Sequence, residues 1–244
     1  MPTTLAAFAP GTQCPCESDR AELNIKRITN MKPFNSILKQ LHNGIATVVV
    51  VAGVSQITIY AATFGEDVAF LEKYTPVVVL CDPSAKAKVA VCPAWQGRVM
   101  TSTSEGDDGF GFGWINRELI SSGKIQPHIN VFGGEDRFWL GPEGGQYSIF
   151  FAKGVKFDLN NWFVPAAFDT MPYEVVKQSK SSVVFQAAFS VTNYSGACFN
   201  VKVNREVKLL TAGDALGKLG VKSGPGLNVV AYETINKISN AGKQ

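Results

Sequence analysis

Short runs of alternating apolar and polar residues fill most of the chain after residue 75, and they predict β-strands. In Phe199–Val207 (FNVKVNREV) the apolar and polar positions mostly alternate before the register shifts. A period of two is typical of strands that bury one face and expose the other to water. We predict strands at 77–81, 88–92, 97–102, 146–152, 173–178, 182–192, 198–210 and 227–238.

Turn-forming residues separate these runs, as in Asn193–Gly196 and Ser223–Gly226. Helical patterns are short, at 66–74 and 212–220, and no long amphipathic helix alternates with the strands. This order predicts an all-β fold, an antiparallel sandwich or barrel.

The last strand pattern runs into turn residues at Ser239–Gly242 and has no returning strand before Gln244. Natural proteins usually cover or blunt a long strand edge. We therefore expect the sandwich to be incomplete at its C-terminus, in a chain that is the N-terminal part of a longer one.

Residues 31–62 have the layout of a secretory signal peptide. Basic residues precede the apolar run Gly44–Val54, and the small residues Ala61 and Ala62 follow it. The run has the length of a signal core and is too short to span a bilayer. We expect an exported protein, periplasmic or extracellular, with no membrane span after cleavage before Thr63.

Two other interpretations of this region stay open. Val48–Val54 is also typical of a buried strand, and an apolar run extended through Ile57 and Ile59 would form an uncleaved anchor. On the signal interpretation Met31 is the initiator, residues 1–30 are an over-extended start, and residues 63–244 form the domain.

Composition narrows the possible partners. With 45% hydrophobic and 18% charged residues the chain can bury a sizeable core. Its formal charge is +3, and the basic residues are scattered, which argues against nucleic-acid binding. Removing residues 1–62 leaves a near-neutral domain, and this balance suits an uncharged partner such as a neutral glycan.

Three cysteines remain after residue 62: Cys81, Cys92 and Cys198. Two strands paired around the turn Asp82–Ala85 place Cys81 and Cys92 about 13 Å apart at about 3.3 Å per residue, beyond the roughly 7 Å Cα limit for a disulfide. We expect no bridge between them and three small buried hydrophobic side chains. No Cys/His cluster is present, so no metal or cofactor is predicted.

The segment His128–Gln146 contains the densest chemistry of the chain. Its glycine pairs permit tight turns, and Glu135, Arg137 and Glu143 offer charge-assisted hydrogen bonds. Trp139 offers a flat apolar face, so the segment combines the groups that hold a sugar. The alternative is an internal ion-pair network that fixes a turn, with Trp139 in the core.

The letters GGEDRFWLGPEGG at 133–145 resemble the G-G-x-x-R-x-W-x-x-P-E pattern of galactose mutarotase-like proteins. They are most similar to a group of exported bacterial proteins whose chemistry is not established. The resemblance implies a large antiparallel supersandwich with a sugar-binding concave face. It extends over much of 64–240, including FGED at 64–67, QGRVM at 96–100, WINRE at 114–118 and VTNYSG at 191–196.

By this resemblance Arg98, Asn116, Arg137 and Glu143 would lie near the cleft. With Glu135, Trp139 and His128 they form the predicted ligand-binding set. Mutarotases use a carboxylate base and a histidine acid. Here His128 is the only histidine after the signal, and its neighbours match neither histidine motif of that family. In mutarotases the base lies in the C-terminal part, which we expect to be missing from this sequence. No catalytic residue is assigned, and His128 is either a structural or rim residue or a site residue.

Two other segments have weaker patterns. Gly109–Trp114 (GFGFGW) lacks the flanking strand, helix and spacing of a nucleotide-binding loop, so we predict a flexible aromatic loop beside the cleft. The acidic residues of Glu105–Asp108 do not have the spacing of a calcium loop, and a solvated turn is expected.

Three functions therefore remain as hypotheses. The first is an exported carbohydrate-binding protein that takes a mono- or oligosaccharide. The second is a sugar-active enzyme, related to aldose epimerases or to carbohydrate lyases and hydrolases, and the third is an envelope scaffold protein. The sequence leaves the question of catalysis open.

Overall fold

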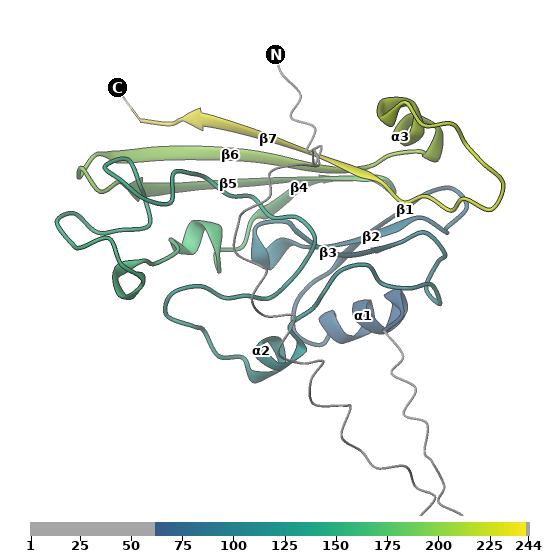
Figure 1. Cartoon of the computed structure of the whole chain (residues 1–244), viewed down its shortest axis with the longest axis horizontal. Coiled ribbons are helices and arrows are strands. Elements are labelled where there is room, and N and C mark those ends of the chain that lie inside the picture. The colour runs from purple at the N-terminus through teal and green to yellow at the C-terminus, as the bar shows by residue number, and fades with distance from the viewer. Residues whose placement is uncertain (1–61, 243–244) are drawn as a thin grey trace, which may run out of the picture. The chain divides into compact units, whose positions relative to one another are not determined.

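The computed structural model describes residues 62–242. Residues 1–61 lie outside the described residues, and with them the predicted over-extended start at 1–30 and all but the last residue of the predicted signal peptide at 31–62. Two antiparallel sheets dominate the described part (Figure 1). The first, in the order β1-β2-β3, contains Val78–Cys81, Lys88–Cys92 and Arg98–Thr103. The second, in the order β4-β5-β6-β7, contains Glu174–Gln178, Ser182–Thr192, Cys198–Leu209 and Tyr232–Asn240.

Helices are short in this part of the chain. The α-helices are α1 (Phe64–Leu71), α2 (Arg117–Ser122) and α3 (Ala212–Leu219), and the 3₁₀ turns are η2 (Pro93–Trp95), η3 (Leu159–Asn161) and η4 (Ala166–Phe168). The all-β, antiparallel prediction is confirmed. Six predicted strands match observed ones within one residue at each end, and the last is observed as β7, starting later than predicted.

The strand predicted at 146–152 is wrong, because this segment forms bends and turns. Phe150 and Phe151 are both buried although they are neighbours. A strand would turn one of the two side chains away from the core. A loop instead inserts both rings, and its backbone bonds to other loops, as in Phe163 N–H to Phe150 O at 2.9 Å.

The two sheets pack against each other through their apolar faces. Leu80 and Val89 from the first sheet share one buried cluster with Phe185 and Val203 from the second. The loops between β3 and β4 add further rings to this cluster, including Phe168. The result is a two-layer sandwich with a continuous core.

Strand β6 keeps its register throughout, in contrast to the shift expected from its sequence. Its ladder with β5 runs without interruption from Cys198 opposite Thr192 to Lys208 opposite Ser182. The polar residue that suggested a shift, Arg205, points inward and is fully buried. Its Nε donates to Gly97 O at 3.1 Å, and its Nη1 donates to Asn236 Oδ1 at 2.9 Å.

Helix α1 starts two residues before the predicted 66–74 segment because its N-terminus is capped. Thr63 Oγ1 accepts from the Glu66 N–H at 3.2 Å, and Thr63 N–H donates to the Glu66 carboxylate at 2.9 Å. This reciprocal capping box is visible in the sequence as T-F-G-E.

The described cysteines are all free, as predicted for Cys81 and Cys92. Cys81 is opposite Lys88 in the ladder, which keeps the two thiols apart. Burial raises the pKa of the Cys92 thiol to about 12. The prediction that all three are buried is wrong for Cys198, which is exposed because it begins β6 beyond the covered part of the sheet.

Candidate functional site

Residues 109–116, here called the aromatic ribbon, lie beside β3 and are joined to it by hydrogen bonds. Phe112 N–H donates to Ser102 O at 2.9 Å, and Gly113 N–H donates to Thr101 Oγ1 at 3.2 Å. Near its start Phe110 bridges to Thr63. The segment predicted as a flexible loop is therefore attached to the sheet.

Glycine at every second position allows this close approach. A Cβ at Gly109 would lie 2.6 Å from Thr103 Oγ1. At Gly111 it would collide with the Asp67 carboxylate, and at Gly113 with the Met100 carbonyl oxygen. Only a residue without Cβ fits at these three positions.

The alternate positions hold aromatic side chains that point away from β3. Phe110 is 51% exposed, Phe112 is 52% exposed and Trp114 is 62% exposed. The Phe110 and Phe112 ring centroids lie 5.5 Å apart with planes at 72°. Large exposed rings on a docked backbone are candidates for contact with another molecule.

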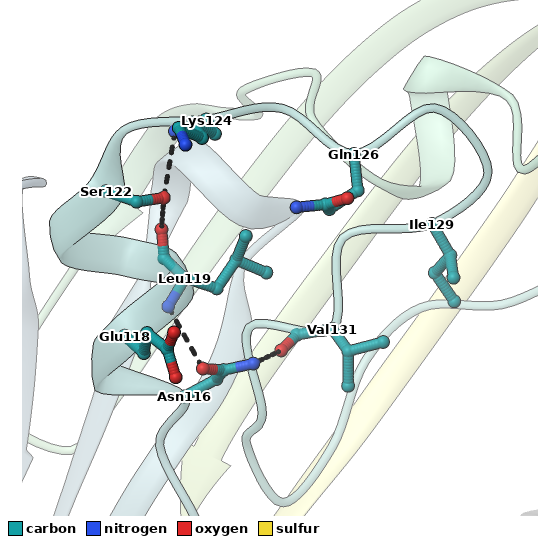
Figure 2. Close-up of a pocket in the computed structure, with 8 residues that line it drawn as sticks. All are labelled: Asn116, Glu118, Leu119, Ser122, Lys124, Gln126, Ile129 and Val131. Carbon is teal, nitrogen blue, oxygen red and sulfur yellow. Dashed lines mark hydrogen bonds between the residues drawn. The ribbon is translucent and has the colours of Figure 1, made fainter.

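The far end of the ribbon leads to a hollow of about 410 Å³ beside α2. Figure 2 shows how its walls combine polar and aliphatic side chains. The Glu118 carboxylate, Lys124 ammonium and Gln126 amide make no hydrogen bond or ion pair with any residue in 62–242, so they are free for a ligand. The complete lining is Asn116, Glu118, Leu119, Ser122, Lys124, Gln126, Ile129 and Val131.

Asn116 has a structural role at the edge of this hollow. Its Oδ1 accepts from the Leu119 N–H at 3.0 Å and caps α2, and its Nδ2 donates to Val131 O at 3.0 Å (Figure 2). The predicted site residue is therefore placed at the hollow, with its amide already hydrogen-bonded.

The aromatic ribbon and the hollow are joined by a short pairing with Gly133 and Gly134 of the 133–145 segment. Trp114 O accepts from Gly134 N–H at 2.8 Å, and Ile115 bridges to Gly133. In an extended segment Trp114 and Asn116 share a side, about 6.6 Å apart. Trp114 is thus two residues before Asn116, which lines the hollow.

Arg98 and Arg137, both predicted site residues, belong to a buried polar cluster elsewhere. Arg98 Nη1 donates to Gly133 O at 3.1 Å, while its Nε and Nη2 have no protein partner. Burial lowers the pKa of Arg98 to about 10, and the neighbouring charge of Arg137 acts in the same direction. Arg137 donates to Phe168 O and lies 3.8 Å from Asp169.

The predicted sugar platform, Trp139, has its ring in contact with protein groups. The Arg137 guanidinium lies over it at 4.2 Å, and the Phe150 ring packs against it at 5.0 Å. Its Nε1–H donates to the exposed Glu143 at 2.8 Å. The ion pair of Arg137 is with Asp169, which lies outside the 133–145 segment.

His128 lies beside the loop that contains η3. Its Nδ1 is 2.6 Å from Trp162 O, and its ring stacks on Phe163 at 4.2 Å. Within residues 62–242 no hydrogen bond or ion pair joins His128 to another predicted site residue.

Glu135 lies between the sheets, where Ser102 Oγ donates to both of its carboxylate oxygens at 2.9 Å. The Tyr232 hydroxyl adds a further hydrogen bond. Burial raises the pKa of Glu135 against the opposing effect of these hydrogen bonds. The carboxyl group thus has two hydroxyl partners and, in the described part of the chain, no cation paired with it.

This environment predicts a pH effect on stability. Because the pKa of Glu135 is raised in the folded state, folding takes up a proton there, and stability falls as the pH rises from the unfolded value of about 4.3. We expect Glu135→Gln to gain stability relative to wild type between pH 4 and pH 7, measured by urea unfolding. Glu118→Gln on α2 controls for the lost charge. An equal response of both variants to pH would contradict the prediction.

A family model matches residues 62–244. The chain belongs to the family of unknown function DUF6786. No curated protein and no solved structure was found that matches it. The galactose mutarotase-like kinship expected from the motif stays a prediction.

The structure thus distributes the predicted site residues of this DUF6786 chain over several places. Arg98 and Arg137 share one buried cluster, and Trp139 pairs with Glu143 on an exposed loop. Glu135 lies between the sheets, and Asn116 lies at the hollow. The functional importance of these residues stays a prediction.

Sequence reasoning missed the exposed rings of Phe110, Phe112 and Trp114 as candidate ligand contacts. The signal was present, because GFGFGWIN alternates with a period of two, with small or apolar residues at one set of positions. The sequence does not show that β3 packs against these glycines, and glycines without a known neighbour are typical of a flexible loop.

Residues 62–242 of this DUF6786 chain contain neither a metal-binding cluster nor a membrane-spanning helix. No group of three or more His, Cys, Asp or Glu side chains there is arranged to hold a metal ion. The acidic turn instead contacts its neighbours, with Asp107 bound to Lys88 at 2.7 Å. None of the helices in this part has the length and apolar character needed to cross a membrane.

Proposed function

We propose that this domain binds carbohydrate, and that the aromatic ribbon and the hollow beside α2 together hold the sugar. The observation that carries the proposal is the row of rings at Phe110, Phe112 and Trp114, all at least half exposed, on a backbone fixed to β3. A monomeric soluble protein rarely exposes such a row without a partner.

Sugars suit the chemistry of this surface. Their C–H faces pack on aromatic rings, and their hydroxyls require directional donors and acceptors nearby. The ribbon offers rings, and the hollow offers an amide at Gln126, an acceptor at Glu118 and a donor at Lys124. One negative and one positive group leave the hollow without net charge, which favours a neutral sugar.

Two features of the sequence support the same function. The 133–145 motif resembles that of galactose mutarotase-like proteins, which bind sugars. The layout of residues 31–62 supports export to the periplasm or the extracellular space, where glycans are abundant. The sugar-binding kinship and the export of the protein are themselves proposed.

A sugar-active enzyme is the second candidate, and Glu135 is the observation in its favour. A carboxyl group whose pKa is raised by burial is a candidate for proton transfer. Any sugar that binds should therefore be tested for mutarotation and for cleavage.

The decisive experiment is a glycan array followed by calorimetry on each hit, with wild type and Trp114→Ala. A tryptophan anchor contributes about 2 kcal/mol, so we expect the variant to bind roughly 10- to 100-fold more weakly. Tyr147→Ala removes a ring of similar exposure outside the ribbon and should bind like wild type.

Circular dichroism would first establish that each variant is folded. A folded wild-type protein that binds no glycan would overturn the proposal and favour the envelope scaffold. Equal losses in Trp114→Ala and Tyr147→Ala would show that the ribbon is not the binding surface.

A further inference from the structure

Strand β7 forms one edge of the four-stranded sheet. It pairs with β6 from Tyr232 opposite Leu209 to Asn240 opposite Val201. Among residues 62–242 no strand pairs with its other side. Figure 1 shows β7 as the outermost strand of its sheet. A strand edge of this kind is a template for a further strand.

The two faces of β7 differ in chemistry. Asn236 lies on the inner face, since its side chain reaches the buried Arg205. By alternation Glu233, Ile235 and Lys237 share the outer face. Ile235 is 38% exposed, and Lys237 has no ion pair with any described residue. Glu233 is partly buried and pairs with Lys218 of α3 at 3.2 Å, so in a dimer its carboxylate would contact two cations.

This outer face is complementary to itself. If a second copy extends the sheet with antiparallel β7 strands centred on Ile235, Glu233 of each copy lies opposite Lys237 of the other. The two Ile235 side chains then meet on the axis. Cross-strand pairs of opposite charge and of β-branched residues both stabilise a sheet.

The neighbouring registers lack this match. Centring on Asn236 places Glu233 opposite Ser239 and Lys237 opposite Ile235. Centring on Lys237 places two ammonium groups opposite each other. Like charges in this position destabilise pairing, so the charges select one register.

We infer that a second copy of this chain pairs with β7, forming a two-fold dimer with a continuous eight-stranded sheet centred on Ile235. Such an isologous contact closes on itself and protects both edges from further association. An apolar groove of about 270 Å³ beside the inner face of β7, which includes Ile238 and Phe199, adjoins the contact.

The experiment is sedimentation of the full chain over a wide concentration range. Wild type should dimerise. Lys237→Glu places carboxylates opposite each other and should weaken dimerisation at least tenfold. The double variant Glu233→Lys/Lys237→Glu exchanges the charges, restores opposite pairs and should recover the dimer. Lys202→Glu, on the adjacent β6, is the control and should dimerise normally.

A second variant keeps the inference testable if Lys237→Glu does not fold. Ile235→Lys puts two like charges on the axis and should also give monomers with an unchanged circular dichroism spectrum. A wild-type monomer at every concentration would overturn the inference, whether the edge stays free or another part of a chain covers it. So would a dimer that the charge reversal does not weaken.

Discussion

Replacing Arg205 with methionine is expected to cause the largest loss of folding stability of any single change considered for this chain. The side chain is fully buried, yet every arm of its guanidinium has a partner. Nε donates to Gly97 O at 3.1 Å, Nη1 donates to Asn236 Oδ1 at 2.9 Å, and Nη2 pairs with Asp136. Arg205 therefore connects the start of β3, the edge strand β7 and the motif segment.

Methionine fills much of the volume but leaves these groups unpaired. Removing one partner of a buried ion pair typically destabilises by about 3–5 kcal/mol. Asp136 is partly exposed and can regain water, which places the expected loss toward the lower end. Urea unfolding monitored by circular dichroism measures it.

The matched control is Lys218→Met, which removes an exposed ion pair with Glu233. Surface pairs of this kind contribute about 0–1 kcal/mol, so its unfolding curve should lie close to that of wild type. Similar curves for both variants would mean that the Arg205 network adds nothing to the folded state.

Arg205 also shows how far the sequence can predict this fold. The alternation in β5 and β6 predicted both strands to within one residue, since one face is buried along much of their length. The pattern could not show that an arginine occupies an inward position. That depends on Gly97 and Asn236, which lie 108 and 31 residues away in the chain.

The candidate site was harder to predict for a related reason. The 133–145 motif was recognised as chemically dense, but its Arg137 and Trp139 contact each other and neighbouring loops. The rings of the ribbon are exposed because β3 occupies the opposite side. Which side of a segment is exposed depends on its contacts with other segments. The spacing of residues within one segment cannot show this.

Gly113→Ala is the second change with a large expected effect, and it tests the docking of the ribbon. A Cβ at this position collides with the Met100 carbonyl oxygen, which belongs to the backbone of β3. Met100 is the bulged residue at which the ladder between β2 and β3 shifts register, and its side chain is fully buried, so its backbone has little room to move. Overpacking typically destabilises by about 1–3 kcal/mol and occasionally by more, and we expect at least the upper part of that range.

Gly217→Ala in α3 is the matched control, since nothing lies within 4 Å of its added Cβ. Alanine there should stabilise the helix by up to about 1 kcal/mol. Gly113→Ala should lower the free energy of unfolding and Gly217→Ala should raise it. This difference in sign separates the collision with Met100 from any general effect of adding a methyl group. Hydrogen exchange at the Phe112 amide, which donates to Ser102 O, locates the change at the ribbon.

The result also bears on the proposed function. If the ribbon detaches while the sandwich stays folded, Gly113→Ala should lose exchange protection at Phe112 and sugar affinity together, although all three rings remain in the chain. Unchanged protection would mean that the glycines do not hold the ribbon on β3. Lost protection with retained affinity would mean that the rings bind sugar without being fixed in a row.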